Sequence, residues 1–244
     1  MKKIISFSVI AMSILSSCLK TNSISGTAAF TIVNAIPNGN PLLMNFSGSG
    51  MAKSINAFNL YGLENQNSGG IGFGSFFELA SYTGRTNLTL VQNSDTLNKI
   101  FSGTFNFQIG GIYSLYLTGT DTLHVDTLFS KDIIPYFPTT GDSLTGVRFV
   151  NLVTGSNPVS VDIAGSPNNT PVLSGLPYKT FSPFQGFSAN ANAINNGYTF
   201  EFRDATSDSL LSTYSLNILP FKSQTLALYG TNANGLSVME VNNY

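Results

Sequence analysis

The sequence predicts an all-β protein, and three observations support this class. Short runs rich in Phe, Tyr, Val, Ile and Thr alternate between apolar and polar residues, as in 86–91, 113–118 and 198–203. Gly, Asn, Asp and Pro separate these runs, which is typical of strands joined by turns. No stretch of ten or more residues has the apolar spacing of an amphipathic helix. We expect each strand to bury one face and expose the other.

The N-terminus has the composition of a secretory signal. Lys2 and Lys3 precede an apolar run over 4–15, and two serines then lead to Cys18, the one cysteine in the chain. A charged start, a short apolar segment and a small-residue cleavage site are typical of signal peptides. The segment 15–18 resembles the lipobox of bacterial lipoproteins, in which the cysteine is lipidated and becomes the mature N-terminus.

Two alternatives describe this segment less well. A transmembrane helix needs about 20 apolar residues, whereas 4–15 is shorter and a polar segment follows Cys18. An ordinary cleaved signal would leave the position of Cys18 unexplained. We therefore predict a signal peptide over 1–17 and a lipidated tether over 18–27. The lipobox resemblance implies three acyl chains, and two or more anchor a protein stably to a membrane.

Composition restricts the partners of the mature chain. Removal of Lys2 and Lys3 leaves nine basic residues against twelve acidic ones. Charged residues make up 9% of the chain, against about 25% in typical domains. We therefore expect no basic surface for nucleic acid and no cationic stripe for phospholipid headgroups. Acylation of Cys18 would leave no cysteine for a disulfide, so the fold depends on its core alone.

Two similar units follow one another along the chain. Segments 29–34 and 146–151 resemble each other, and Asn-Pro and a second predicted strand follow each of them. Further matches join 84–90 with 197–202, 95–97 with 208–210 and 113–119 with 223–230. The separation drifts from 117 through 113 to 111 residues, as small loop differences would cause. We predict one β-sandwich domain over 28–130, a linker over 131–144 and a second β-sandwich domain over 145–244.

Each unit has about 100 residues and about seven short strands, which suggests two tandem immunoglobulin-like β-sandwiches. The Cys pair and core Trp of true immunoglobulin domains are absent, since the chain has no Trp. A barrel or jelly roll of similar strand number stays open. The linker contains prolines and is expected to be stiff at first and then flexible. Its apolar residues are expected to pack into the domain junction; they are Ile133, Ile134, Tyr136 and Phe137.

The unit also resembles a known family. It opens with a strand that ends in Val-Asn-Ala before a proline (33–37), and a second strand follows Asn-Pro. A glycine then leads a Tyr-Thr-Phe-Glu-Phe-Arg strand (197–203), and a closing strand ends in Tyr-Gly (226–230). These features resemble the DUF4397 family of bacterial cell-envelope β-sandwich domains, which is common in Bacteroidetes-type lipoproteins. The resemblance covers most of the mature chain and implies no catalytic residues.

Residues that could perform catalysis are few. His124 is the one histidine, and in a strand it would share a face with Asp126, as an acid–base pair requires. No G-x-S-x-G nucleophile motif accompanies it, and we expect His124 on the solvent face of a late strand. Asp204 and Asp208 flank a short turn and could contact calcium, but turn formation is the commoner role of Asp. We predict no catalytic residue, no metal site and no cofactor.

Aromatic side chains are abundant, with 19 Phe and 10 Tyr. Most are expected in the core, because each buries a large area. Four fall in a loop-like segment and are candidate ligand-binding residues for a sugar or a peptide; they are Tyr178, Phe181, Phe184 and Phe187. The alternative is that they cover an open sandwich edge. The absence of Trp weakens the carbohydrate interpretation.

The expected function is that of a non-enzymatic cell-envelope lipoprotein whose two modules serve adhesion, assembly or scaffolding. A glycan-binding accessory lipoprotein of a polysaccharide-uptake system is the alternative, and an enzyme built on His124 and Asp126 is a third hypothesis. The expected partners are a membrane, through the lipid anchor, and an envelope protein or glycan, but no nucleic acid. Lys20 after Cys18 indicates the outer membrane by analogy with other lipoproteins, and the membrane face stays open.

Overall fold

The computed structural model describes residues 26–37, 41–46, 71–137, 143–166, 171–233 and 235–243. Across these ranges the protein is almost entirely β, with sixteen strands and one short helix, which confirms the all-β class. No helix within them is long and apolar enough to cross a membrane. The predicted signal peptide and Cys18 lie outside the described residues.

The first half of the chain forms two sheets. The first inner sheet has the order β3-β1-β6-β7 and contains β1 (Thr27–Asn34), β3 (Ser75–Tyr82), β6 (Ile112–Gly119) and β7 (Val125–Lys131). The first outer sheet has the order β2-β4-β5 and contains β2 (Leu42–Asn45), β4 (Gly84–Gln92) and β5 (Asp95–Phe107). Strands β1 and β6 are parallel, and the other neighbours are antiparallel.

The second half repeats this arrangement. The second inner sheet contains β8 (Leu144–Asn151), β15 (Ser223–Thr231) and β16 (Gly235–Asn242), with β11 (Thr180–Phe181) and β12 (Gln185–Ser188) both pairing with β8. The second outer sheet has the order β10-β9-β13-β14 and contains β9 (Val159–Ile163), β10 (Leu173–Leu176), β13 (Tyr198–Asp204) and β14 (Leu210–Leu216). Strand β8 pairs in parallel with β15, as β1 does with β6.

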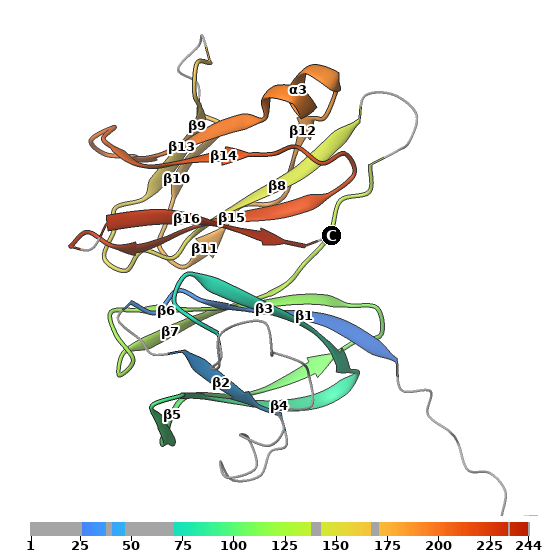
Figure 1. Ribbon diagram of the computed structural model, residues 1–244, viewed down its shortest axis with the longest axis vertical. Coiled ribbons are helices and arrows are strands. Elements are labelled where there is room, and N and C mark those ends of the chain that lie inside the picture. Colours follow the sequence, from blue (N-terminus) through green and yellow to red (C-terminus); the bar gives the residue numbers. More distant parts are fainter. Residues whose placement is uncertain are drawn as a thin grey trace, which may run out of the picture.

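The four sheets are stacked as layers, with the two inner sheets in the middle (Figure 1). Each inner sheet packs on its own outer sheet around an apolar core. The first core includes Phe30, Ile32, Leu88, Leu90 and Leu115. The second includes Phe149, Val161, Phe200, Phe202 and Leu228. Aromatic rings meet edge to face in the second core, where the centroids of Phe149 and Phe200 are 5.3 Å apart.

The matched segments at the start of each half end in an asparagine with the same role. The Nδ2 of Asn34 donates to the carbonyl of Ile71 at 2.9 Å, and the Nδ2 of Asn151 donates to the carbonyl of Leu176 at 3.2 Å. In both halves the asparagine Oδ1 accepts a backbone N–H two residues further on, at 3.1 Å. The amide thus provides a partner for one backbone carbonyl and one backbone N–H in each half, which gives a physical reason for asparagine where each first strand ends.

A matched pair of glycines has an equally specific role. Gly119 ends β6 with a φ of 138°, and Gly230 lies near the end of β15 with a φ of 115°. A Cβ at Gly119 would lie 2.0 Å from the carbonyl oxygen of His124, and one at Gly230 would lie 2.4 Å from that of Gly235. Glycine is therefore required where each strand turns closely into the next one.

The expectation that every strand buries only one face is wrong for the central strands of the inner sheets. All residues of β6 after Ile112 and all residues of β8 after Leu144 are buried. The reason is that each inner sheet packs on its own outer sheet with one face and on the other inner sheet with its second face. The alternation of 86–91 and 198–203 does match exposure, since these segments lie in the outer strands β4 and β13.

Two local expectations also need correction. Helix α3 (Ala191–Asn196) was not expected; its six residues are too few for a periodic signal, and Asn190 caps it by accepting the N–H of Ala193 at 3.0 Å. In the linker, Ile133 and Tyr136 are 82% and 85% exposed and do not enter the junction. Ile134 and Phe137 are half-buried. Among the linker residues that the structure describes, Asp132 is the one that is buried, and Arg148 is its charged partner at the junction.

Candidate functional site

The most developed site among the described residues is the junction between the two inner sheets. Its centre is apolar and contains Val33, Ala35 and Tyr116 from the first half and Val150, Leu152, Ala227, Met239 and Val241 from the second. These side chains are buried, with Met239 the most accessible at 7%. Burial of this apolar surface favours close contact of the sheets, because the hydrophobic effect scales with the area removed from water.

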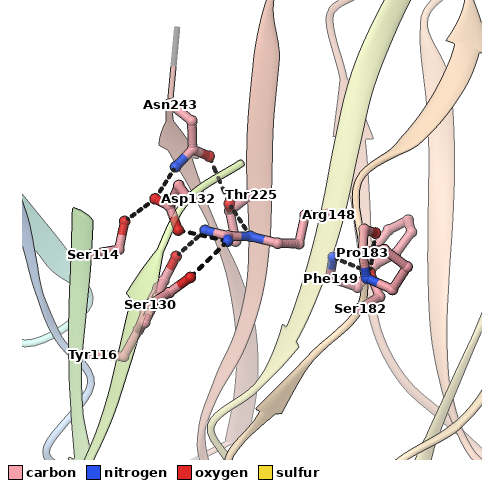
Figure 2. Close-up of polar contacts among 10 residues, drawn as sticks. All are labelled: Ser114, Tyr116, Ser130, Asp132, Arg148, Phe149, Ser182, Pro183, Thr225 and Asn243. Atoms are coloured by element: carbon pink, nitrogen blue, oxygen red, sulfur yellow. Dashed lines mark hydrogen bonds and ion pairs between the residues drawn. The ribbon is translucent and has the colours of Figure 1, made fainter. Parts of the chain in front are cut away.

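A buried ion pair crosses the junction beside this apolar centre (Figure 2). Arg148 lies in the middle of β8, and Asp132 directly follows β7. The Nη1 of Arg148 is 2.7 Å from the Oδ1 of Asp132, and their side chains are 3% and 0% exposed. The pair therefore connects the two halves in a region from which water is excluded.

Both charged groups have further polar partners. Arg148 donates from Nε to Thr225 at 3.1 Å, from Nη1 to Ser130 at 3.3 Å and from Nη2 to the Tyr116 hydroxyl at 3.0 Å.

The carboxylate of Asp132 is also bonded on its second oxygen. Its Oδ2 accepts from Ser114 at 2.6 Å and from Asn243 at 3.2 Å. Such bonds offset the large cost of removing two charges from water.

Two phenyl rings lie against the same guanidinium. The Cζ of Arg148 is 5.2 Å from the centroid of Phe181 and 4.7 Å from that of Phe184, which is within cation–π range. Ser182 positions the segment that carries both rings: its Oγ accepts the N–H of Phe149 at 3.0 Å and donates to the carbonyl of Pro183 at 2.8 Å (Figure 2).

A second, more exposed polar contact joins the halves through β7. Asp126 accepts from the Nζ of Lys179 and from the hydroxyl of Tyr178, each at 2.9 Å. The Lys179 and Asp126 side chains are 38% and 43% exposed. The hydrogen bonds from Lys179 and Tyr178 lower the pKa of Asp126 below its ordinary value.

The structure separates the four predicted ligand-binding aromatics. Phe187 is 9% exposed and packs in the second core, where it does not present a face to a ligand. Phe181 and Phe184 contact Arg148, and Tyr178 contacts Asp126. The four rings therefore do not form one platform. The short strands of this segment, β11 and β12, pair with the edge of β8, which is the kind of position that the alternative interpretation describes.

The hypothetical pair of His124 and Asp126 does not form. His124 lies in the turn before β7, with its side chain 74% exposed and its Nδ1 3.0 Å from the Oδ1 of Asp121. Asp121 also accepts the backbone N–H groups of Leu123 and His124, which holds this turn in place. Asp126 instead contacts Tyr178 and Lys179 in the second half.

The other acidic candidates have structural partners. Asp204 accepts the N–H groups of Thr206 and Ser207 at 2.8 and 2.9 Å, the turn role that was expected. A polar hollow of about 350 Å³ on the second outer sheet is lined in part by Asp162, Glu201, Arg203 and Asp208. Arg203 contacts all three of these carboxylates. Among the described residues, no group of three or more His, Cys, Asp or Glu side chains is arranged to hold a metal ion.

Arg148 and Asp132 were not among the candidate residues. The signal that could have identified Arg148 is its position within the apolar run 147–150, in a chain with few charges. Arginine in a buried strand needs a carboxylate partner. Nothing local to Arg148 identifies that partner as Asp132.

Comparison with known proteins does not assign the chain to a family. No protein-family model matches it, and no curated protein matches it significantly. The resemblance to DUF4397 therefore stays a prediction.

Proposed function

We propose that this protein is a non-enzymatic cell-envelope lipoprotein, held at a membrane through a lipid on Cys18. Two tandem immunoglobulin-like β-sandwich modules form its body and serve adhesion, assembly or scaffolding. The outer membrane is the proposed location, and an envelope protein is the proposed partner.

The observation that carries this proposal is the junction. The Arg148–Asp132 pair and the apolar centre around Val33 and Val150 join two sandwiches into one body. A flexible linker would allow the modules to reorient, whereas buried polar groups with specific partners favour one arrangement. A fixed pair of modules suits a scaffold, because it holds its binding surfaces at a constant distance.

The experiment is fractionation of cells that produce the full chain or its Cys18→Ala variant. The proposal expects wild-type protein in the outer-membrane fraction, labelled by a fatty-acid analogue, and unlabelled variant protein released from that fraction. A Ser17→Ala variant is the matched control and should behave like the wild type. Cytoplasmic wild-type protein without label would contradict the proposed location and anchor.

A second arm concerns the scaffolding role. Photo-crosslinking from exposed positions such as Tyr82 in intact cells should capture an envelope protein. Capture of glycan alone, with retention of the chain on a polysaccharide column, would instead favour the glycan-binding alternative. Hydrolysis of an envelope substrate by the purified chain would contradict the non-enzymatic part of the proposal.

A further inference from the structure

One tripeptide recurs through the chain in a way that composition does not explain. Five of the eight aspartates are followed by Ser or Thr and then by Leu; they are Asp95, Asp121, Asp126, Asp142 and Asp208. With 53 Ser or Thr and 25 Leu among 244 residues, chance would give fewer than one such tripeptide after eight aspartates. The recurrence therefore needs a physical cause.

Duplication of the unit accounts for only one pair. Asp95 and Asp208 are separated by 113 residues, the spacing of the matched segments around them. Asp121 and Asp126 have no counterpart about 111 residues later, where Asn232 and Ser237 stand. Three of the five copies thus arose outside the matched segments.

A common role in folding does not explain the copies either. Asp95 and Asp121 accept backbone N–H groups in turns. Asp126 lies in a strand and contacts the other half of the chain, and Asp208 has a φ of 58°. Because the same three residues occur in different conformations, their shared feature is the sequence itself.

The leucines point to recognition from outside. Leu97, Leu123 and Leu210 are 85%, 88% and 52% exposed. Because these leucines bury little apolar surface, they contribute little to the stability of the fold. Folding therefore does not account for a leucine at the same place in each tripeptide. An exposed apolar side chain beside a carboxylate and a hydroxyl is instead a compact recognition feature for another protein.

The three copies with exposed leucines lie at or beside hairpin turns at one end of the molecule. One copy opens β5, one lies in the turn before β7, and one leads into β14; these turns lie on the left in Figure 1, away from the start of β1 at Thr27. The middle residues Thr96 and Thr122 are partly exposed, and Ser209 is exposed. A membrane attachment that precedes β1 would leave this end accessible.

We propose that Thr96, Thr122 and Ser209 are sites of O-glycosylation and that Asp-Ser/Thr-Leu with an exposed leucine, at or beside a hairpin turn, is the recognised signal. The hydroxyl is the one nucleophile that the tripeptide offers. Its oxygen attacks the anomeric carbon of a sugar carried on a phosphate or diphosphate. A glycosidic C–O bond forms, the bond from that carbon to the phosphate oxygen breaks, and the hydroxyl proton passes to a base of the transferase.

The choice of a sugar over a phosphoryl group rests on the proposed function. An exported envelope protein folds where nucleoside triphosphates are scarce, whereas lipid-linked sugar phosphates reach that compartment. Sugars would also add polar surface to a chain with only 9% charged residues, which supports solubility without added charge.

The chain contains its own control. Asp126-Thr127-Leu128 has the same sequence, but Leu128 packs against the junction, whereas the leucines of the three proposed sites are exposed. If the transferase reads the exposed leucine of the folded protein, Thr127 stays unmodified. Ser207 is a second control, since it is exposed two residues before Ser209 and lacks the flanking pattern.

The test is peptide-level mass spectrometry of the full chain purified from the envelope of its own host. The proposal expects hexose-containing additions on the three peptides with Thr96, Thr122 and Ser209, and none on Thr127 or Ser207. Thr96→Ala and Leu97→Ala should each remove the addition from that turn alone, whereas Ser207→Ala should leave all three. Envelope-located protein without sugar, with an addition of phosphate only, or with equal sugar on Thr127 would overturn the inference. None of these results would bear on the anchor, which fractionation tests separately.

Discussion

The junction between the halves contains two ion pairs that differ in burial. Arg148–Asp132 is 2.7 Å long, and its side chains are 3% and 0% exposed. Lys179–Asp126 is 2.9 Å long, and its side chains are 38% and 43% exposed. The two pairs join the same halves at similar distances and differ in how far water reaches them.

Burial changes how much each pair contributes to the free energy of unfolding. The exposed pair exchanges contacts with water for contacts with protein, and such pairs contribute about 0–1 kcal/mol. The buried pair has already lost its hydration, so removal of one partner leaves an uncompensated charge inside the protein. We therefore expect the buried pair to be sensitive to the loss of either partner and the exposed pair to add only modest stability.

The largest expected effect is that of Asp132→Ala. It leaves the Arg148 guanidinium buried without its carboxylate, and we expect a loss of about 3–5 kcal/mol in the free energy of unfolding. Urea denaturation followed by circular dichroism measures this loss. A split into two transitions would show that the halves had come apart.

The matched control is the double variant Asp132→Leu with Arg148→Met. Replacement of both charges by apolar groups of similar size removes the unpaired charge but also takes a partner from Ser114, Ser130, Tyr116 and Asn243, so we expect the double variant to be only about 1–2 kcal/mol more stable than Asp132→Ala. A double variant as unstable as Asp132→Ala would mean that the loss arises from packing and not from the unpaired charge.

A smaller effect is expected from Phe184→Leu. The substitution keeps an apolar side chain near Arg148 but removes the ring that lies 4.7 Å from its Cζ. We expect a loss of about 0.5–2 kcal/mol, the range of cation–π contacts from exposed to desolvated sites. Thermal unfolding can measure it, with Phe221→Leu at an exposed phenylalanine as the control. Equal losses in both variants would argue against a specific role for the ring.

The exposed pair is expected to respond to pH. The pKa of Asp126 is lowered in the folded protein, mainly by the hydrogen bond from Lys179. Its stabilising contribution is therefore present above the ordinary Asp pKa and is lost as the pH falls through the lowered folded value. Asp126→Asn should cost less than about 1 kcal/mol at pH 7, after allowance for solvent screening, and almost nothing near pH 2. A loss that is equal at the two pH values would contradict this assignment.

Salt gives the smallest effect and separates the pairs directly. At 1 M NaCl the screening length falls to about 3 Å, which weakens exposed charges far more than buried ones. The cost of Lys179→Met should fall by a few tenths of a kcal/mol between 0.05 and 1 M NaCl. The cost of Asp132→Ala should stay nearly constant over the same range. Comparable salt dependence in both variants would mean that water reaches the buried pair.

Local patterns were sufficient for much of the fold. Alternation identified strands such as β4 and β13, because outer strands have one face on the core and one in water. The segment matches anticipated features that recur in both halves, such as Asn34 with Asn151 and Gly119 with Gly230, because each meets a local backbone requirement. Helix α3 was missed because six residues contain no full period of a helical pattern.

The candidate site was largely beyond the reach of sequence reasoning. The Tyr178–Phe187 sequence is compatible with a ligand platform and with the cover of a sandwich edge, and it does not show that Phe187 packs in a core or that two of its rings contact Arg148. The sequence of a strand does not show whether another sheet covers its polar face, because that depends on how the sheets assemble. Alternation along β6 is the same whether water or another sheet covers its polar face.

The β class, the likeness of the two halves and the positions of many strands follow from local sequence, because backbone conformation and side-chain alternation depend on near neighbours. The contact of the inner sheets, the pairing of Asp132 with Arg148 and the contact of Asp126 with Lys179 instead of His124 arise only in the packed fold. These contacts join residues 16 or more positions apart. Their choice depends on which groups lose water together, and that is settled only when the sheets pack.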